Sequence, residues 1–111
     1  MYMSKREILD GLEPELIKTA EKVGYNFYKW GSQDRPNFYR YTRTDIVIVN
    51  EESRTITLNN GGWYTITTKR KMNQILAKYG YYIFQVDYEW YIKNTFSGEI
   101  FEFHNEIRLN Y

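Results

Sequence analysis

Cysteine is absent from this chain of 111 residues, and histidine occurs only once. Without a thiol, the protein has no disulfide, no cysteine-ligated zinc and no thiolate nucleophile. Small secreted domains usually depend on disulfides for their stability. The sequence therefore predicts a cytoplasmic protein, and it excludes enzymes of the cysteine type.

Long apolar segments and a dominant sign of charge are missing as well. A membrane-spanning helix needs about 20 consecutive apolar residues, which no stretch of the chain approaches, and residues 1–10 are charged where a signal peptide is apolar. Lys and Arg number 15 and Asp and Glu number 14, which gives a formal net charge of +1. This balance excludes strong non-specific attraction to duplex DNA or to an anionic membrane. Any recognition must be local.

Aromatic residues, in contrast, are abundant, because they make up 19% of the chain and include 12 tyrosines. With 42% hydrophobic residues in total, this is the composition of a folded globular protein. The length suits a single domain over residues 1–111. A core this small cannot bury every tyrosine, so we expect several of them at the surface.

Residues 1–24 are predicted to be helical. Ser4 and Glu7 have the spacing of a capping box, which marks the start of a short helix. A second helix is predicted from apolar residues at helical spacing, which end with Val23, and Gly24 would terminate that helix.

Residues 25–60 are predicted to form strands, because aromatic and β-branched runs alternate there with turn-forming residues. The runs are residues 25–30, 38–42, 46–49 and 55–58. A loop over residues 31–37, which contains Pro36, joins the first two runs, and a polar turn over residues 50–53 joins the last two.

Residues 61–111 are predicted to hold one helix followed by hairpins. The helix begins after Thr67 or Thr68 and ends at Gly80. From Tyr82 to Ile92 every second residue is apolar or aromatic, which predicts a strand with one buried face. Because strands rarely exceed about 10 residues, we expect a turn near Asp87. A turn over residues 95–98 leads to two short strands in residues 99–111.

These elements predict an α+β fold: an antiparallel sheet of about five to seven strands, with the N-terminal helical region and one further helix packed on one side.

Groups with catalytic chemistry are scarce. No serine has the setting of a nucleophile elbow, and Gly61 and Gly62 lack the spacing of a phosphate-binding loop. Asp87 and Glu89 are interpreted as part of a solvated strand face rather than as an acid and base pair. We therefore expect a protein that is not an enzyme, has no catalytic residue and needs no cofactor.

One metal hypothesis stays open, at Glu102, His104 and Glu106. These residues share a face if the segment is one strand, and they offer oxygen, nitrogen and oxygen ligands. A strand separates its first and fifth residues by about 13 Å, so the ligands converge only if the chain bends. A surface histidine between acids is the alternative interpretation.

Positive charge gathers at Lys69, Arg70 and Lys71, which the predicted boundaries place in the first turn of the helix. The positive end of the helix dipole disfavours cations there by about 0.3 to 1 kcal/mol each. The charges therefore indicate either an anion or carboxylate-binding surface or a device for solubility. The same helical pattern places Asn73 and Gln74 away from the apolar face.

A second basic and aromatic segment follows residue 37. Tyr39, Arg40, Tyr41 and Arg43 alternate ring and charge, as in platforms for single-stranded nucleic acids. With Phe38 and Arg40 on one face and Tyr39, Tyr41 and Arg43 on the other, neither face is purely apolar. This pattern indicates an edge or interface strand.

The stretch Gly-Trp-x-Thr-x-Thr-Thr-Lys within residues 56–69, running into Met72 and Asn73 and followed by a Trp-Tyr pair in residues 89–92, resembles a group of small phage and prophage proteins. The resemblance covers about half of the chain, and Tyr64 stands where an arginine is common in the group. It implies a mobile-element origin, a bacterial host and a strand-turn-helix-hairpin core, in which Trp63 would fill the core.

Three functions are compatible with these features. The first is an inhibitor that binds a host defence protein, by analogy with anti-CRISPR proteins that block Cas nucleases. The second is a small binder of single-stranded DNA or RNA, and the third is the metal site described above. The residues expected to bind a partner, whether protein or nucleic acid, are Lys69, Arg70, Lys71, Arg40, Arg43, Tyr39 and Tyr41.

Overall fold

The computed structural model describes residues 1–31 and 35–111. The helices of this part are α1 (Lys5–Ile8), α2 (Pro14–Thr19), α3 (Ile66–Leu76) and the 3-10 helix η1 (Ala77–Tyr79). Its strands are β1 (Glu21–Gly24), β2 (Phe27–Trp30), β3 (Asn37–Tyr41), β4 (Thr44–Asn50), β5 (Thr55–Leu58), β6 (Tyr81–Val86), β7 (Glu89–Asn94), β8 (Ile100–Glu102) and β9 (Ile107–Asn110). Residues 32–34 of the predicted 31–37 loop lie outside the described residues. The predicted α+β fold is confirmed.

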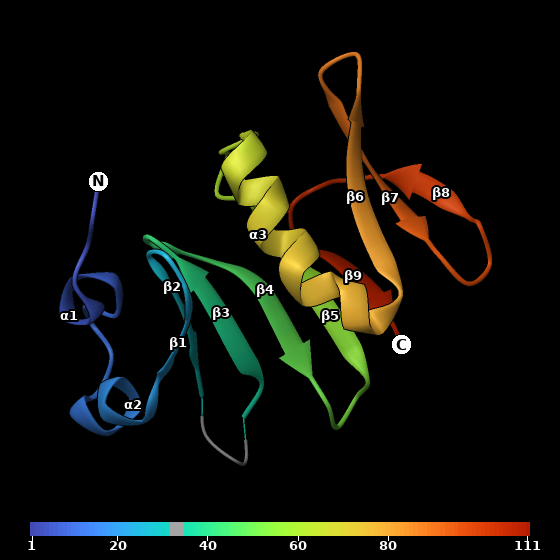
Figure 1. The fold of residues 1–111 in the computed structure, drawn as a ribbon. Helices are drawn as coiled ribbons and strands as arrows, with labels where there is room; N and C mark the ends of the chain where they lie inside the picture. The colour runs from blue at the N-terminus through green and yellow to red at the C-terminus, as the bar shows by residue number, and fades with distance from the viewer. Residues whose placement is uncertain (32–34) are drawn as a thin grey trace.

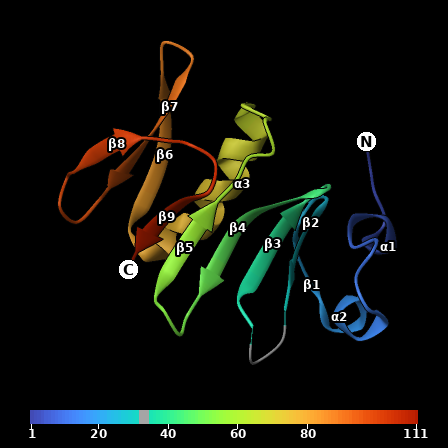
Figure 2. The ribbon, with the colours of Figure 1, turned by 180° about the vertical axis from the view of Figure 1, so that it is seen from behind.

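The strands form two antiparallel sheets (Figure 1). A six-stranded sheet has the order β1-β2-β3-β4-β5-β9, and a three-stranded sheet has the order β6-β7-β8. The C-terminal strand β9 thus returns to pair with β5. Figures 1 and 2 show the long helix α3 across one face of the six-stranded sheet and alongside β6. Helix α3 therefore connects the two sheets.

The six-stranded sheet is covered on both faces rather than on one side as predicted. In β2, Phe27 packs into the large core beneath α3, whereas Tyr28 and Trp30 pack against Ile8, Leu9 and the N-terminal helices. Successive residues of a strand point to opposite faces, so these alternate aromatics feed two separate cores. Strand β3 lies between β2 and β4, so of the two predicted positions, edge or interface, the edge position is wrong. Neither face of β3 is purely apolar, yet both are covered, because Tyr39 packs in the main core and Phe38 packs against the N-terminal core.

The N-terminal region is only partly helical. The capping box is confirmed, because the Glu7 amide donates to Ser4 Oγ (3.2 Å) and the Ser4 amide donates to Glu7 Oε1 (3.0 Å). Helix α2, however, ends at Thr19, and Val23 lies in strand β1. The backbone of β1 pairs with β2, from Glu21 opposite Lys29. Strand pairing here prevails over the local helical pattern, as tertiary context often does.

Strands β6 and β7 form a hairpin whose two turn residues are Asp87 and Tyr88, with φ of 50° and 69°. The predicted turn near Asp87 is confirmed, and two central residues with positive φ are typical of tight hairpins. The pairing of Phe84 with Tyr91 shows that even positions of β6 share a face with odd positions of β7. The predicted single buried face is therefore wrong: Ile83 and Ile92 are buried, whereas Tyr82 is 50% exposed.

Tyr79, which packs against the main core beneath α3, makes the stability of the protein sensitive to alkaline pH. Burial, more than the neighbouring tyrosines and Glu51, raises the pKa of Tyr79 from 10.0 to about 12. The folded state thus favours the neutral Tyr79 side chain. The contribution of Tyr79 to the free energy of unfolding is fully present below pH 10, and it is lost as the pH rises toward 12. We expect Tyr79→Phe to flatten this loss in melting temperatures measured across that interval. Equal losses in the variant and the parent protein would contradict this role.

Candidate interaction surface

The three-stranded sheet carries a row of exposed and half-buried apolar side chains on the side away from the core. We call this the outer face, and its apolar members are Tyr82, Phe84, Val86, Tyr91 and Ile100. Tyr82, Val86 and Ile100 are 50%, 48% and 53% exposed. Residues on the opposite side of the same strands, such as Ile83, Trp90 and Ile92, are buried in the main core. The outer face is therefore separate from the main core, and its apolar side chains alternate across the strands with Glu89, Lys93 and Glu102.

Aromatic rings on the outer face stack on one another. The ring centroids of Tyr82 and Phe84 lie 6.4 Å apart with the planes tilted by 11°, and those of Phe84 and Tyr91 lie 5.7 Å apart with a tilt of 26°. Contiguous exposed apolar patches on soluble proteins commonly mark interaction sites, and Tyr side chains are enriched at protein interfaces. The arrangement is suited to covering a flat partner surface.

The surroundings of this face are acidic. Residues 81–102 contain four acidic residues and one basic residue, Lys93, so their net charge is −3. The Tyr91 hydroxyl donates a hydrogen bond to Glu89 Oε2 (3.2 Å), and this bond to Glu89 raises the pKa of Tyr91. Acidic groups repel phosphates, so the outer face favours a partner with a basic surface.

Helix α3 fixes the sheet that carries the outer face. The Asn73 side chain donates from Nδ2 to the Ile83 carbonyl (2.9 Å) and accepts from the Ile83 amide at Oδ1 (2.8 Å). Strand β6 is an edge strand, and these two bonds satisfy the backbone amide and carbonyl of Ile83 that no neighbouring strand pairs. Unpaired backbone groups at a sheet edge can otherwise pair with another chain and cause aggregation. On the inner side, Tyr64 packs edge-on against Trp90 and Phe103. The prediction that Asn73 points away from the apolar face of the helix is therefore wrong, because its side chain binds the backbone of Ile83.

The three predicted helical cations lie in the second turn of α3 rather than in its first. The helix begins at Ile66, because Thr65 is the N-cap and its Oγ1 accepts from the Thr68 amide (3.1 Å). Lys69 reaches Gln85 Oε1 (3.4 Å), and Lys71 Nζ lies 5.6 Å from the Phe27 ring centroid. The electrostatic penalty expected from the first turn therefore does not apply.

The four predicted residues of the β3 segment are also separated. Tyr39 is 3% exposed and belongs to the main core. Arg40 forms an ion pair with Asp45 on the opposite face of the sheet, toward the N-terminal helices. Tyr41 is half-buried beneath Lys71, and of these four residues only Arg43, in the β3–β4 turn, is exposed. The seven predicted residues do not form one surface, and the partner role of the exposed cations stays a prediction.

Trp63 does not fill the core. Its side chain is 65% exposed on the loop before α3, where Gly61 and Gly62 adopt φ of 64° and 87°. The expected tight turn is present, but it turns the indole outward. Tyr64 rather than Trp63 covers the core, as its contacts with Trp90 and Phe103 show.

The predicted metal ligands do not converge. Glu106 Oε1 accepts from Asn59 Nδ2 (2.7 Å), and His104 Nδ1 lies 3.0 Å from the Asn105 carbonyl oxygen. The chain turns between β8 and β9 at these residues, so they do not share the face of one strand. In the described ranges 1–31 and 35–111, no three His, Cys, Asp or Glu side chains form a group that could hold a metal. Asp87, of the carboxylate pair, lies in the hairpin turn.

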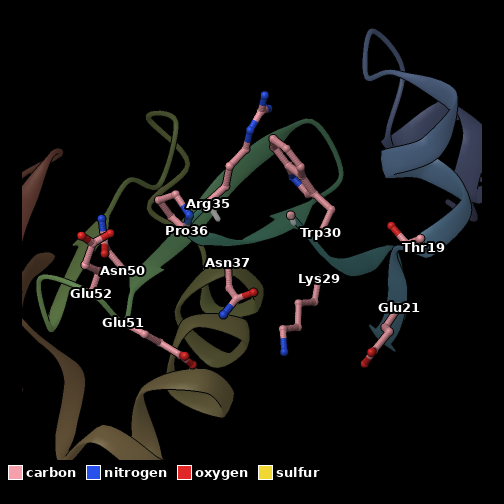
Figure 3. A pocket seen from close by; sticks show the side chains of 11 residues that line it. Thr19, Glu21, Lys29, Trp30, Arg35, Pro36, Asn37, Asn50, Glu51 and Glu52 are labelled. Carbon is pink, nitrogen blue, oxygen red and sulfur yellow. The ribbon is translucent and has the colours of Figure 1, made fainter. Parts of the chain in front are cut away.

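A wide pocket of about 530 Å³ opens at one end of the six-stranded sheet (Figure 3). Its charged side chains are of both signs and include Lys29, Arg35 and Glu51. Figure 3 shows that they point in different directions, with Lys29 and Arg35 on opposite sides of the sheet. Among the described residues that line it, this pocket therefore brings together no catalytic or ligand-binding set.

No helix in the described part of the chain is long and apolar enough to cross a membrane.

The family model described as Kyanoviridae Gp96 protein, a phage family, matches residues 32–110. No curated protein and no solved structure matches the chain. The match covers most of the chain, including α3 and both strands of the β6–β7 hairpin. The chain therefore belongs to the Kyanoviridae Gp96 protein family, a phage family of unknown function.

Proposed function

We propose that this phage protein acts without catalysis, by binding a protein of the infected cell through the outer face of β6–β8. The observation that carries the proposal is the row of Tyr82, Phe84, Val86, Tyr91 and Ile100 on one side of the sheet, in which Tyr82, Val86 and Ile100 are about half exposed. Apolar and aromatic side chains held on a rigid sheet lose little entropy on binding and are effective interface anchors.

The acidic surroundings of the outer face suggest the nature of the partner. A net charge of −3 over residues 81–102 complements a basic surface. Proteins that handle nucleic acids present such basic surfaces, because they must attract phosphates. A bacterial defence nuclease, for example a Cas nuclease, has this character. In its specific form, the proposal is an inhibitor that covers the nucleic-acid-binding surface of such an enzyme.

Affinity capture from a lysate of the phage's host tests the proposal. We expect the tagged protein to retain a discrete host protein, and the double substitution Tyr82→Ser with Phe84→Ser to weaken this complex at least about tenfold. The substituted side chains lie on the solvent side of the sheet, so the fold should remain intact. Adding the parent protein to the purified partner should then inhibit that partner's nucleic-acid cleavage or binding.

Tyr2→Ser with Tyr25→Ser is a matched control. These two exposed rings also lie close together, at 6.1 Å, but at the N-terminal end of the molecule. The control should bind like the parent protein. Retention of nucleic acid alone, released between about 50 and about 200 mM salt, would instead indicate phosphate-driven binding and contradict the proposal.

A further inference from the structure

A second, smaller pocket lies between the start of α3 and the β3–β4 turn. Its volume is about 200 Å³, below the range of roughly 300 to 1,000 Å³ that drug-sized ligands occupy. Trp63 and Tyr41 contribute aromatic walls, and Asn60 lies among the lining residues. The dimensions suit a single planar ring system.

The loop that forms this pocket is held by its own hydrogen bonds. Asn60 Oδ1 accepts from the Gly62 amide (2.8 Å), and the Asn60 carbonyl accepts from the Trp63 amide (2.9 Å). Gly61 approaches the opposite wall so closely that a Cβ there would lie 2.7 Å from Thr44 Oγ1. The loop is thus held in a defined conformation close to Thr44.

Asn60 carries an unpaired donor at this pocket. The residue is 0% exposed, and its backbone amide also has a partner, Asn105 Oδ1 (2.8 Å). Its side-chain nitrogen Nδ2 alone has no hydrogen-bond partner in the described part of the chain. Because Oδ1 is held by Gly62, rotating the amide would only exchange one unpaired group for another. Buried polar groups are almost always paired, so this donor indicates a ligand with a hydrogen-bond acceptor.

The aromatic and hydroxyl groups of the pocket narrow the ligand further. The Trp63 ring is 65% exposed, although exposing so large an apolar surface is unfavourable. A planar ligand stacked on the indole would cover it. Thr42 and Thr44 also line the pocket, and each brings a hydroxyl group to its wall. A hydroxyl can both donate and accept a hydrogen bond, which suits the edge of a nucleobase, where donors and acceptors lie side by side.

The charge around the pocket is positive. No acidic residue is among those that line it. Arg43 lies in the turn between the lining residues Thr42 and Thr44 and is exposed, and Lys71 Nζ is 5.8 Å from the Tyr41 ring centroid. The N-cap residue Thr65 also lines the pocket, so the positive end of the α3 dipole points toward it. A phosphate at the rim would be stabilised by all three features.

We propose that this pocket binds a nucleotide, with the base stacked on Trp63, a base carbonyl or ring nitrogen accepting from Asn60 Nδ2, and the phosphate near Arg43 and Lys71. This chemistry is shared by a free mononucleotide and by one unpaired nucleotide of a single strand. The pocket is separate from the outer face, so the proposal does not depend on the function proposed above.

Calorimetric titration with the four nucleoside 5′-monophosphates, single-stranded tetranucleotides and ribose 5-phosphate tests the proposal. We expect saturable binding of at least one base, with Kd below about 1 mM, and much weaker binding of ribose 5-phosphate. Tetranucleotides that bind at least about tenfold tighter than the monophosphate would identify a single strand as the source. Comparable affinities would identify the free nucleotide. Binding of ribose 5-phosphate as tight as that of any nucleotide, or no binding of either ligand class, overturns the proposal.

Variants locate the site. Trp63→Ala changes an exposed side chain and should weaken binding about tenfold without loss of folding, as circular dichroism would verify. Asn60→Asp keeps the acceptor for the Gly62 amide but removes the donor, and should weaken binding by a similar factor. Tyr88→Ala, which removes another exposed aromatic ring away from the pocket, should bind like the parent protein. Unchanged affinity in the folded Trp63→Ala protein would refute the site.

Discussion

Asp45→Ala should lower the free energy of unfolding by about 3 kcal/mol, the lower end of the range for removing one partner of a buried ion pair, because the Arg40–Asp45 pair is mostly but not fully buried. Asp45 accepts from Arg40 Nε and Nη2, both at 3.0 Å, and from Trp30 Nε1 at 2.8 Å. The side chains of Arg40 and Asp45 are only 15% and 22% exposed. The alanine variant would thus leave a guanidinium and an indole N–H poorly solvated between the sheet and the N-terminal helices.

Urea unfolding followed by circular dichroism measures this effect. Asp45→Asn, which keeps the shape and one acceptor but loses the charge, should give an intermediate value. Because Arg40 Nη1 also donates to the Ile8 carbonyl (3.3 Å), the N-terminal helices should become more accessible to protease in Asp45→Ala. A loss of less than about 1 kcal/mol would place this pair with ordinary surface ion pairs.

The second large effect is expected from Asn73→Ala, at about 2 to 4 kcal/mol. The substitution removes both hydrogen bonds to Ile83, a fully buried residue, and leaves its backbone amide and carbonyl unpaired. Each buried unpaired group costs about 1 to 3 kcal/mol. Because these bonds join α3 to β6, the three-stranded sheet should loosen relative to the rest of the protein.

Hydrogen exchange distinguishes this local loosening from general destabilisation. The Ile83 amide should exchange much faster in Asn73→Ala, whereas amides in β4 should change only as far as global stability does. Gln74→Ala is a matched control on the next residue, since its side chain makes a single exposed bond to the Val23 carbonyl (2.9 Å) and should cost below about 1 kcal/mol. Equal effects of the two variants would show that Asn73 has no special role.

The strands and the long helix could be predicted from the sequence because each has a strong local signal. The alternating residues of β2 to β5, the apolar spacing of α3 and the left-handed Gly80 are all encoded within a few neighbours, whereas the helix begins at Ile66, earlier than the predicted start after Thr67 or Thr68. Strand β1 could not be found in this way, because its pairing with β2 outweighs the local helical pattern. The pairing of β9 with β5 likewise depends on residues far apart in the chain.

The outer face was missed for a geometrical reason. The alternation from Tyr82 to Ile92 is regular in sequence, but a hairpin with two turn residues pairs even positions with odd ones. The same pattern therefore points outward in β6 and inward in β7. Counting the two turn residues Asp87 and Tyr88 shows that Tyr82 and Phe84 lie on one face of the sheet and Ile92 on the other. The position of Trp63 could not be predicted either, because the local sequence does not show whether the turn at Gly61 and Gly62 directs the next side chain into the core or outward.

Site-specific photo-crosslinking tests the central claim, that the outer face binds a protein, most directly. A photoreactive phenylalanine analogue in place of Tyr82 should yield one discrete protein adduct when the protein is irradiated in lysate of the phage's host. The same analogue in place of Tyr25, which is equally exposed at the other end of the molecule, should yield none. A protein adduct from position 25 alone, or nucleic acid as the sole adduct from position 82, would contradict the account.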